Sequence, residues 1–79
     1  MKPLSKAEKR VLDSIGTKLK ELRIKKGYKS YETFAFDKEI NRMQYWRMEK
    51  GLANMSMATL LRILEIHKIS LKDFFKDFE

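Results

Sequence analysis

The chain has 79 residues, of which 43% are hydrophobic and 37% charged, so it can bury one modest core but cannot divide into two cored domains. It has no cysteine and no run near the roughly 20 apolar residues that cross a bilayer, which excludes disulfides, thiolate chemistry and a membrane-spanning helix. We therefore expect a cytoplasmic protein, and we expect no secretory signal because the basic N-terminus lacks an apolar segment.

The net charge is +7 and is distributed unevenly along the chain. Residues 1–50 hold fourteen basic and seven acidic side chains, whereas residues 51–79 hold four of each. A one-sided basic surface suits a polyanionic partner, either nucleic acid or an anionic membrane surface, although basic residues also serve solubility alone.

A long first helix is predicted near the N-terminus. Ser5 followed by Glu8 forms a capping-box pattern. The apolar residues after it recur at the spacing of one helical face: Val11, Leu12, Ile15, Leu19 and Leu22. Gly16 within this face indicates close packing, and Gly27 can end the helix in the left-handed conformation.

Two shorter helices are expected next. Ser30 can cap the segment "YETFAFD", and Asn41 followed by Gln44 predicts the start of a third helix that ends at Gly51. The residues expected to point inward from the second helix are Phe34 and Ala35. The short turn between these helices contains Glu39.

Serines also mark the start of two further helices. Ser56 can cap "MATLLRILEIHK", and Ser70 with Asp73 can start "LKDFFKDF". The apolar residues of the fourth helix are Leu60, Leu61, Ile63, Leu64 and Ile66. No strand-like alternation is sustained, so we expect residues 1–79 to form a single all-α domain. We expect this domain to be a compact fold of five helices.

The last predicted helix carries an aromatic stripe. Leu71, Phe74, Phe75 and Phe78 are spaced three, four and seven residues apart, which places them on one helical face. This face either closes the core of the monomer or contributes a contact in a homodimer.

The third helix, "INRMQYWRMEKG", presents two different faces at about 100° per residue. Tyr45 and Met48 fall on the core side with Asn41. The opposite side carries Arg42, Met43, Trp46 and Arg47. Arginine can form bidentate bonds to guanine and apolar groups can touch thymine methyls, so this face suits the DNA major groove. Trp46 is either a half-buried packing residue or part of that outer face.

Two short helices joined by a tight turn, the second bearing such a face, form a helix-turn-helix. The chain resembles the lambda-repressor-like (Xre/Cro-type) helix-turn-helix family through "IGTKLKELRIKKG", "SYETFAF", "INRMQYWRMEKG" and "NMSMATLLRILEIHKIS". The resemblance covers about residues 15–75, and residues 1–14 would extend the first helix. It implies that the second and third helices form the motif.

The resemblance also implies individual contacts. Base-contacting positions correspond to Arg42, Met43, Trp46 and Arg47. Phosphate-contacting positions correspond to Lys29, Ser30, Tyr31, Gln44, Lys50 and Asn54. Arg23 and Glu49 match a structural pair that ties the first helix to the end of the third.

Three departures from the family pattern bear on these contacts. Tyr31 stands where the family usually has glutamine, so a side-chain link between phosphate and base is lost. Glu39 stands where glycine is usual, so it sits at positive φ with strain or the turn differs. The stretch "GYKS" is one residue longer than the common form.

The remaining polar residues favour structural roles. His67 has no cluster of carboxylates at ligand spacing, and the serines are placed as helix caps rather than as nucleophiles. We expect no enzymatic activity, no metal, no cofactor and no small-molecule ligand.

We therefore predict a sequence-specific binder of double-stranded DNA that regulates transcription, with repression the expected direction and a homodimer expected on a two-fold operator through Phe74, Phe75 and Phe78. Two alternatives stay open. The same fold can serve as a protein-interaction or antitoxin-like module, with Met43 and Trp46 docking a protein. The basic first helix could instead bind an anionic membrane surface.

Overall fold

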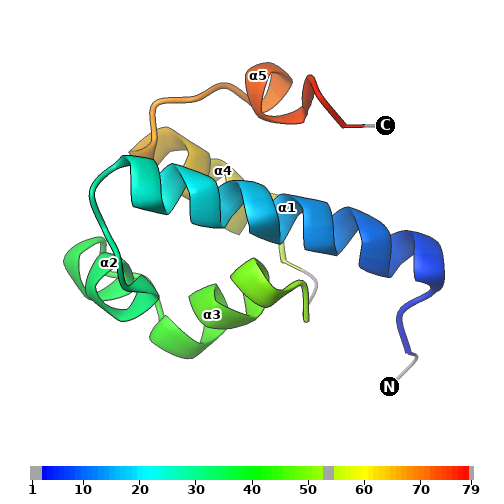
Figure 1. Cartoon of the computed structure of the whole chain (residues 1–79), viewed down its shortest axis with the longest axis horizontal. Coiled ribbons are helices and arrows are strands. Elements are labelled where there is room, and N and C mark those ends of the chain that lie inside the picture. The colour runs from blue at the N-terminus through cyan, green and yellow to red at the C-terminus, as the bar shows by residue number, and fades with distance from the viewer. Residues whose placement is uncertain (1–2, 53–54, 79) are drawn as a thin grey trace.

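The computed structural model describes residues 3–52 and 55–78, and these residues form five α-helices and no strand. The helices are α1 (Lys6–Lys25), α2 (Tyr31–Asp37), α3 (Arg42–Lys50), α4 (Met57–Ile66) and α5 (Leu71–Phe75). The long helix α1 runs across the molecule, with α2 and α3 on one side of it and α5 on the other (Figure 1). The all-α prediction is confirmed.

Each helix begins at a side chain that caps its free amides. The side chains of Ser5, Ser30, Asn41, Ser56 and Ser70 each accept a hydrogen bond from an amide two or three residues ahead. At α1 the box is complete, because Glu8 Oε1 also accepts from the Ser5 amide at 2.9 Å. Gly27 lies just beyond α1 in the left-handed region (φ +105°), as predicted. Gly51, where the third helix was predicted to end, also adopts a left-handed conformation (φ +67°).

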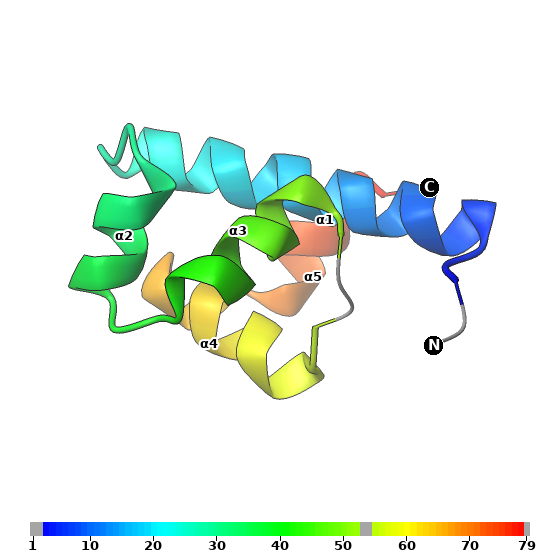
Figure 2. The ribbon, with the colours of Figure 1, turned by 90° about the horizontal axis from the view of Figure 1, so that it is seen from below.

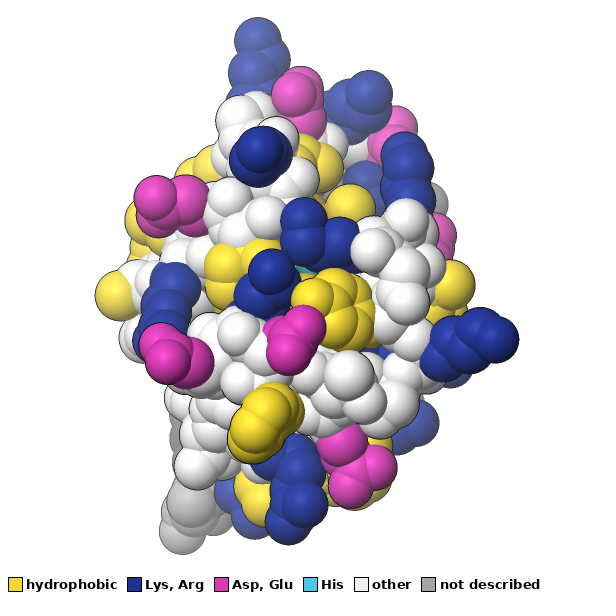
Figure 3. All heavy atoms as spheres, turned by 90° about the vertical axis from the view of Figure 1, so that its left-hand side faces the viewer, with side chains coloured by type: hydrophobic (Ala, Val, Ile, Leu, Met, Phe, Trp, Pro, Cys, Tyr) yellow, Lys and Arg dark blue, Asp and Glu magenta, His cyan; other side chains and the backbone are white. Residues whose placement is uncertain are grey.

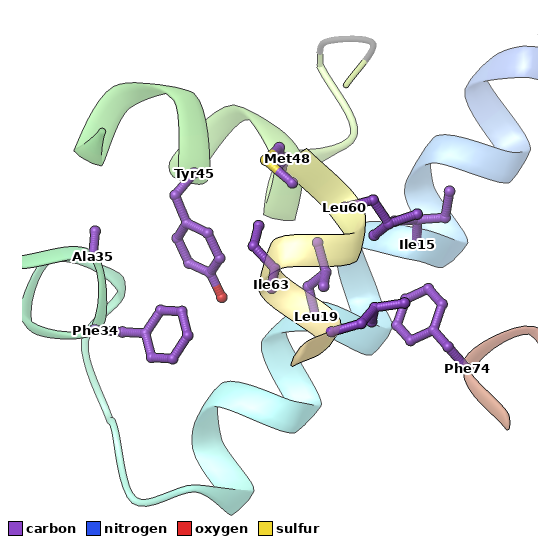
Figure 4. Close-up of a cluster of buried hydrophobic side chains, with 10 residues drawn as sticks. Ile15, Leu19, Phe34, Ala35, Tyr45, Met48, Leu60, Ile63 and Phe74 are labelled. Carbon is purple, nitrogen blue, oxygen red and sulfur yellow. The ribbon is translucent and has the colours of Figure 1, made fainter. Parts of the chain in front are cut away.

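The core lies between α1, α2, α3 and α4 (Figure 4). Phe34 of α2 and Tyr45 of α3 are fully buried, and their ring centroids are 5.1 Å apart. The other fully or nearly fully buried apolar residues are Leu12, Ile15, Leu19, Ala35, Met48, Leu60, Ile63, Leu64 and Phe74. This core holds the helix-turn-helix against α1 and α4.

The C-terminal segment closes the core of the monomer. Phe74 is fully buried, so its predicted role as a contact between copies is wrong. Phe75 and Phe78 are half-buried against the core. The helix α5 ends at Phe75, earlier than predicted, so Phe78 does not continue a helical stripe.

Two further details of the helices bear on their surfaces. Val11, which was predicted on the buried face of α1, is 48% exposed because the packed stripe runs through Leu12, Ile15 and Leu19 instead. Among the described residues, no helix combines the length and the apolar character that a membrane span requires.

Candidate nucleic-acid interface

The turn between α2 and α3 fixes the angle of the motif. Glu39 lies at φ +56°, so the predicted left-handed residue is confirmed at a non-glycine position. The Ile40 amide donates to the Ala35 carbonyl at 2.9 Å, and Arg62 of α4 donates to the Glu39 carbonyl at 3.2 Å. One hydrogen bond within the motif and one from α4 therefore hold the strained turn in place.

The helix α3 has one buried and one exposed face, as its periodicity predicts. Tyr45 and Met48 are buried against α1 and the core. Arg42, Met43 and Arg47 are exposed, and 51% of Met43 is accessible to solvent. Trp46 is half-buried, so it packs against the protein and still presents part of its indole. Figure 2, which views the molecule from below, shows α3 crossing in front of α1.

The described residues that the family resemblance assigns to phosphate lie at the start of α2 and on α3. Lys29, Gln44 and Lys50 are exposed, while Ser30 and Tyr31 are half-buried. Ser30 Oγ accepts from the Glu32 and Thr33 amides at 3.1 and 3.3 Å, so it caps α2, and its hydroxyl proton is what it can donate to a phosphate. Asn54 lies outside the described residues. Lys and Arg side chains are spread over the end of the molecule where α1 meets α2, with Asp and Glu side chains among them (Figure 3).

Arg23 of α1 and Glu49 of α3 are brought together in a buried ion pair. Arg23 Nε lies 2.7 Å from Glu49 Oε2, and Arg23 Nη2 donates to Oε1 at 3.1 Å. Arg23 Nη1 also donates to the Tyr28 carbonyl at 2.8 Å. The hydrogen bonds to Glu49 raise the pKa of Arg23, which keeps the guanidinium charged. This pair fixes the C-terminal half of α3 to α1.

Gly16 of α1 allows the same half of α3 to approach closely. A Cβ at Gly16 would lie 2.7 Å from the Met48 carbonyl oxygen and would collide with the carbonyl of Glu49. The close packing predicted at this glycine is confirmed. Because the two backbones touch, a tilt of α3 cannot occur without moving α1.

Sequence reasoning missed two residues beside the outer face. Phe36 is 85% exposed, and Glu32 lies 3.7 Å from the guanidinium of Arg42. Both residues help to line a shallow hollow with Thr33 and Ile40. Phe36 is two residues from the buried Phe34, and in a helix that spacing turns it to the opposite side. The Glu32 contact joins residues ten apart, so no local pattern reveals it.

The titratable residues of the described ranges do not form a metal site, since no three His, Asp or Glu side chains gather there. The Tyr45 hydroxyl is buried without a hydrogen-bond partner among the described residues, and burial raises its pKa. Its position in the core between α2 and α3 gives it a packing role.

Comparison with known proteins supplies two similar chains, while no family model matches. The chain is 38% identical over 64 residues to "Control protein C.MunI" of a Mycoplasma species, covering 81% of this chain and 86% of that protein. Its structure is similar to the crystal structure of the restriction-modification controller protein C.AhdI from Aeromonas hydrophila. The TM-score is 0.72 and the identity 32%, with 84% of this chain and 98% of that chain covered.

Proposed function

We propose a specific role for this chain, which belongs to the controller proteins of the lambda-repressor-like (Xre-type) helix-turn-helix family. The chain binds double-stranded DNA sequence-specifically and regulates transcription, and it is not an enzyme. Our proposal concerns three finer points. The chain reads its operator with the outer face of α3, binds as a homodimer, and controls restriction–modification genes. The last point is supported by the similarity to C.AhdI, which is a restriction-modification controller protein.

The exposed face of α3 is the observation that carries the proposal. Arg42 and Arg47 are exposed on a helix that is anchored by buried residues on its other side. A helix fits the major groove in width, and each guanidinium can form two hydrogen bonds to the O6 and N7 atoms of one guanine. Met43 and the exposed part of Trp46 can touch thymine methyls. We therefore assign base readout to these four residues.

Basic and polar residues beside α3 would hold the phosphates. Lys29 and Lys50 are exposed at the two ends of the motif, and Gln44 is exposed in the first turn of α3. We assign phosphate contacts to Lys29, Ser30, Tyr31, Gln44, Lys50 and Asn54. Such contacts attract any duplex and set the register, whereas the base contacts discriminate between sequences.

We also propose a homodimer whose contact surface lies on α4. Met57 and Leu61 are one helical turn apart and are 58% and 45% exposed. Large apolar side chains that share an exposed face are typical of interfaces between copies. Half-buried Phe75 and Phe78 can contribute at the edge, but Phe74 cannot. Such a dimer would present two copies of α3 to an operator with two-fold symmetry.

The readout by α3 is tested with Arg42→Ala and Arg47→Ala on a duplex selected from a random library. Each variant should lose about 1–3 kcal/mol of binding free energy on that duplex and should relax the preference at one base pair. Binding is measured by fluorescence anisotropy, with Arg10→Ala on α1 as a matched control for lost charge. Equal losses on random and selected duplexes would count against base readout.

A further inference from the structure

The first two turns of α1 contact the C-terminal end of α3 through Lys9. Lys9 Nζ donates to the Gly51 carbonyl at 2.9 Å and to the Lys50 carbonyl at 3.3 Å. Asp13, one turn further along α1, holds the same ammonium at 2.7 Å. The side chain of Lys9 therefore binds two carbonyls at the end of the recognition helix. These carbonyls belong to residues 41 and 42 positions after Lys9 in the sequence.

These carbonyls are groups that the helix itself leaves without partners. The last carbonyls of an α-helix have no intrahelical donor, and they carry the negative end of the helix dipole. Around Gly51 the Gly51 and Leu52 amides already bond to the Met48 and Arg47 carbonyls at 3.2 and 2.9 Å. The Lys50 and Gly51 carbonyls follow, and the Lys9 ammonium supplies both hydrogen bonds and charge to them.

The backbones are also in close contact at this point. Gly51 is buried, and a Cβ there would lie 3.0 Å from the Asp13 amide and would collide with the Asp13 carboxylate. Gly51 therefore sits directly on the N-terminal part of α1. Together with the Arg23–Glu49 pair, α1 holds the end of α3 at two separate points.

We propose that Lys9 is a positioning residue for DNA recognition, an inference that rests on the proposed readout by α3. By holding the Lys50 and Gly51 carbonyls, Lys9 fixes where α3 ends and where Lys50 projects toward the phosphate backbone. Small errors in the placement of a recognition element weaken the contacts that require exact geometry more than they weaken diffuse attraction. Lys9 thus acts on specific binding without touching a base.

A direct electrostatic role predicts something different. If Lys9 contributed only its positive charge, its loss would weaken all duplexes alike, and Lys6 would behave in the same way. Lys6 is exposed and lies one turn before Lys9 at the same end of α1. It is therefore the matched control for charge and location.

The experiment compares Lys9→Met, Lys9→Arg and Lys6→Met with the unchanged protein. Binding to the selected duplex and to a random duplex is measured at 25 °C, after circular dichroism has established that each variant is folded at that temperature. Lys9→Met should bind the selected duplex about tenfold more weakly, the size of a lost charged hydrogen bond, and the random duplex less than about twofold more weakly. Arginine keeps a positively charged donor at this position, so Lys9→Arg should recover most of the binding.

Hydrogen exchange supplies a readout independent of DNA. The Leu52 amide, bonded to the Arg47 carbonyl, should exchange faster in Lys9→Met, while amides of α4 keep their rates. Equal losses on both duplexes for Lys9→Met and Lys6→Met, or no loss for Lys9→Met, would overturn the positioning role. A protein that does not distinguish the two duplexes at all would instead overturn the proposed function.

Discussion

Glu49 shows how one residue can decide whether α3 keeps its orientation. Its side chain is 6% exposed, and its carboxylate accepts two hydrogen bonds from Arg23, whose side chain is 5% exposed. A buried ion pair contributes little net stability compared with an apolar pair, but removal of one partner leaves an uncompensated buried charge. The pair therefore acts mainly to hold α3 in a single position on α1.

The substitution Glu49→Gln should reveal that buried charge. The Arg23 guanidinium loses its counter-charge, so the free energy of unfolding should fall by about 3–5 kcal/mol, as measured by urea denaturation. Glu21→Gln, at an exposed position of α1, is the control and should change stability by less than about 0.5 kcal/mol. Similar small effects for both variants would mean that the pair is not what holds α3.

The environment of His67 could not be predicted from the residues around it in the sequence. Its ring stacks on Phe34 with centroids 5.3 Å apart and an interplanar angle of 4°, and its Nε2 is buried without a hydrogen-bond partner among the described residues. Burial, with Lys26 and Lys38 nearby, lowers the pKa of His67 below its ordinary value of 6.5. The folded protein therefore favours the neutral form of the imidazole.

This lowered pKa makes stability depend on pH in a definite direction. Below pH 6.5 the unfolded chain binds a proton that the folded chain does not, so stability is complete above about pH 6.5 and decreases as the pH falls toward the folded pKa. Thermal unfolding between pH 8 and pH 5 should show this decrease. His67→Phe, which keeps a ring against Phe34, should lose less stability over the same range. A parallel decrease in both proteins would assign the effect to other groups.

The helices themselves could be predicted closely because local chemistry specifies their ends. Serine or asparagine caps begin all five helices, and glycines at positive φ follow α1 and α3. No glycine follows α4 or α5, and their predicted ends were two and three residues too late. Local signals thus define an element well only where a residue with a specific backbone preference is present.

The turn between α2 and α3 offers a direct test of this local chemistry. Glu39 adopts φ +56°, a conformation that costs an L-residue roughly 1–2 kcal/mol, and glycine relieves this cost although it also gains entropy in the unfolded chain. Glu39→Gly should therefore raise stability by up to about 1 kcal/mol, measured by thermal unfolding. Its hydrogen bond from Arg62 involves the backbone carbonyl and is retained.

The control for that variant is Glu21→Gly, within the exposed face of α1, which should lose about 1 kcal/mol because glycine disfavours a helix interior. A loss of equal size in Glu39→Gly would show that the carboxylate side chain, rather than the backbone, stabilises the turn.

In the molecule as a whole, one surface can be predicted from the sequence, whereas the long-range contacts are revealed only by the folded structure. The outer face of α3 follows from periodicity, because a helix with buried Tyr45 and Met48 must present Met43 and Arg47 on its other side. Arg42, in the first turn, is exposed at the flank of that face. Lys9 bonds to carbonyls 41 and 42 positions along the chain, and Arg23 bonds to Glu49 across 26. Arg23 and Glu49 were paired through the family resemblance, whereas no local pattern identifies the contact of Lys9.

The same chain concentrates its charge where the proposed interface lies. Its net charge is +7, and the basic excess belongs to the first fifty residues, which include α1, α2 and α3. Each phosphate that such a surface neutralises releases counterions, so binding should weaken steeply as salt rises. The contacts to base edges set sequence preference and should persist while the overall affinity falls.

A selection from a random library of DNA duplexes, carried out at about 50 mM and about 200 mM salt, tests the proposed function most directly. It should enrich one sequence with two-fold symmetry, whose half-sites lie about 34 Å apart or a multiple of that distance. The affinity should drop by at least about tenfold at the higher salt while the same sequence is retained. Enrichment of no sequence at either salt, or binding that does not depend on salt, would contradict recognition of an operator by α3.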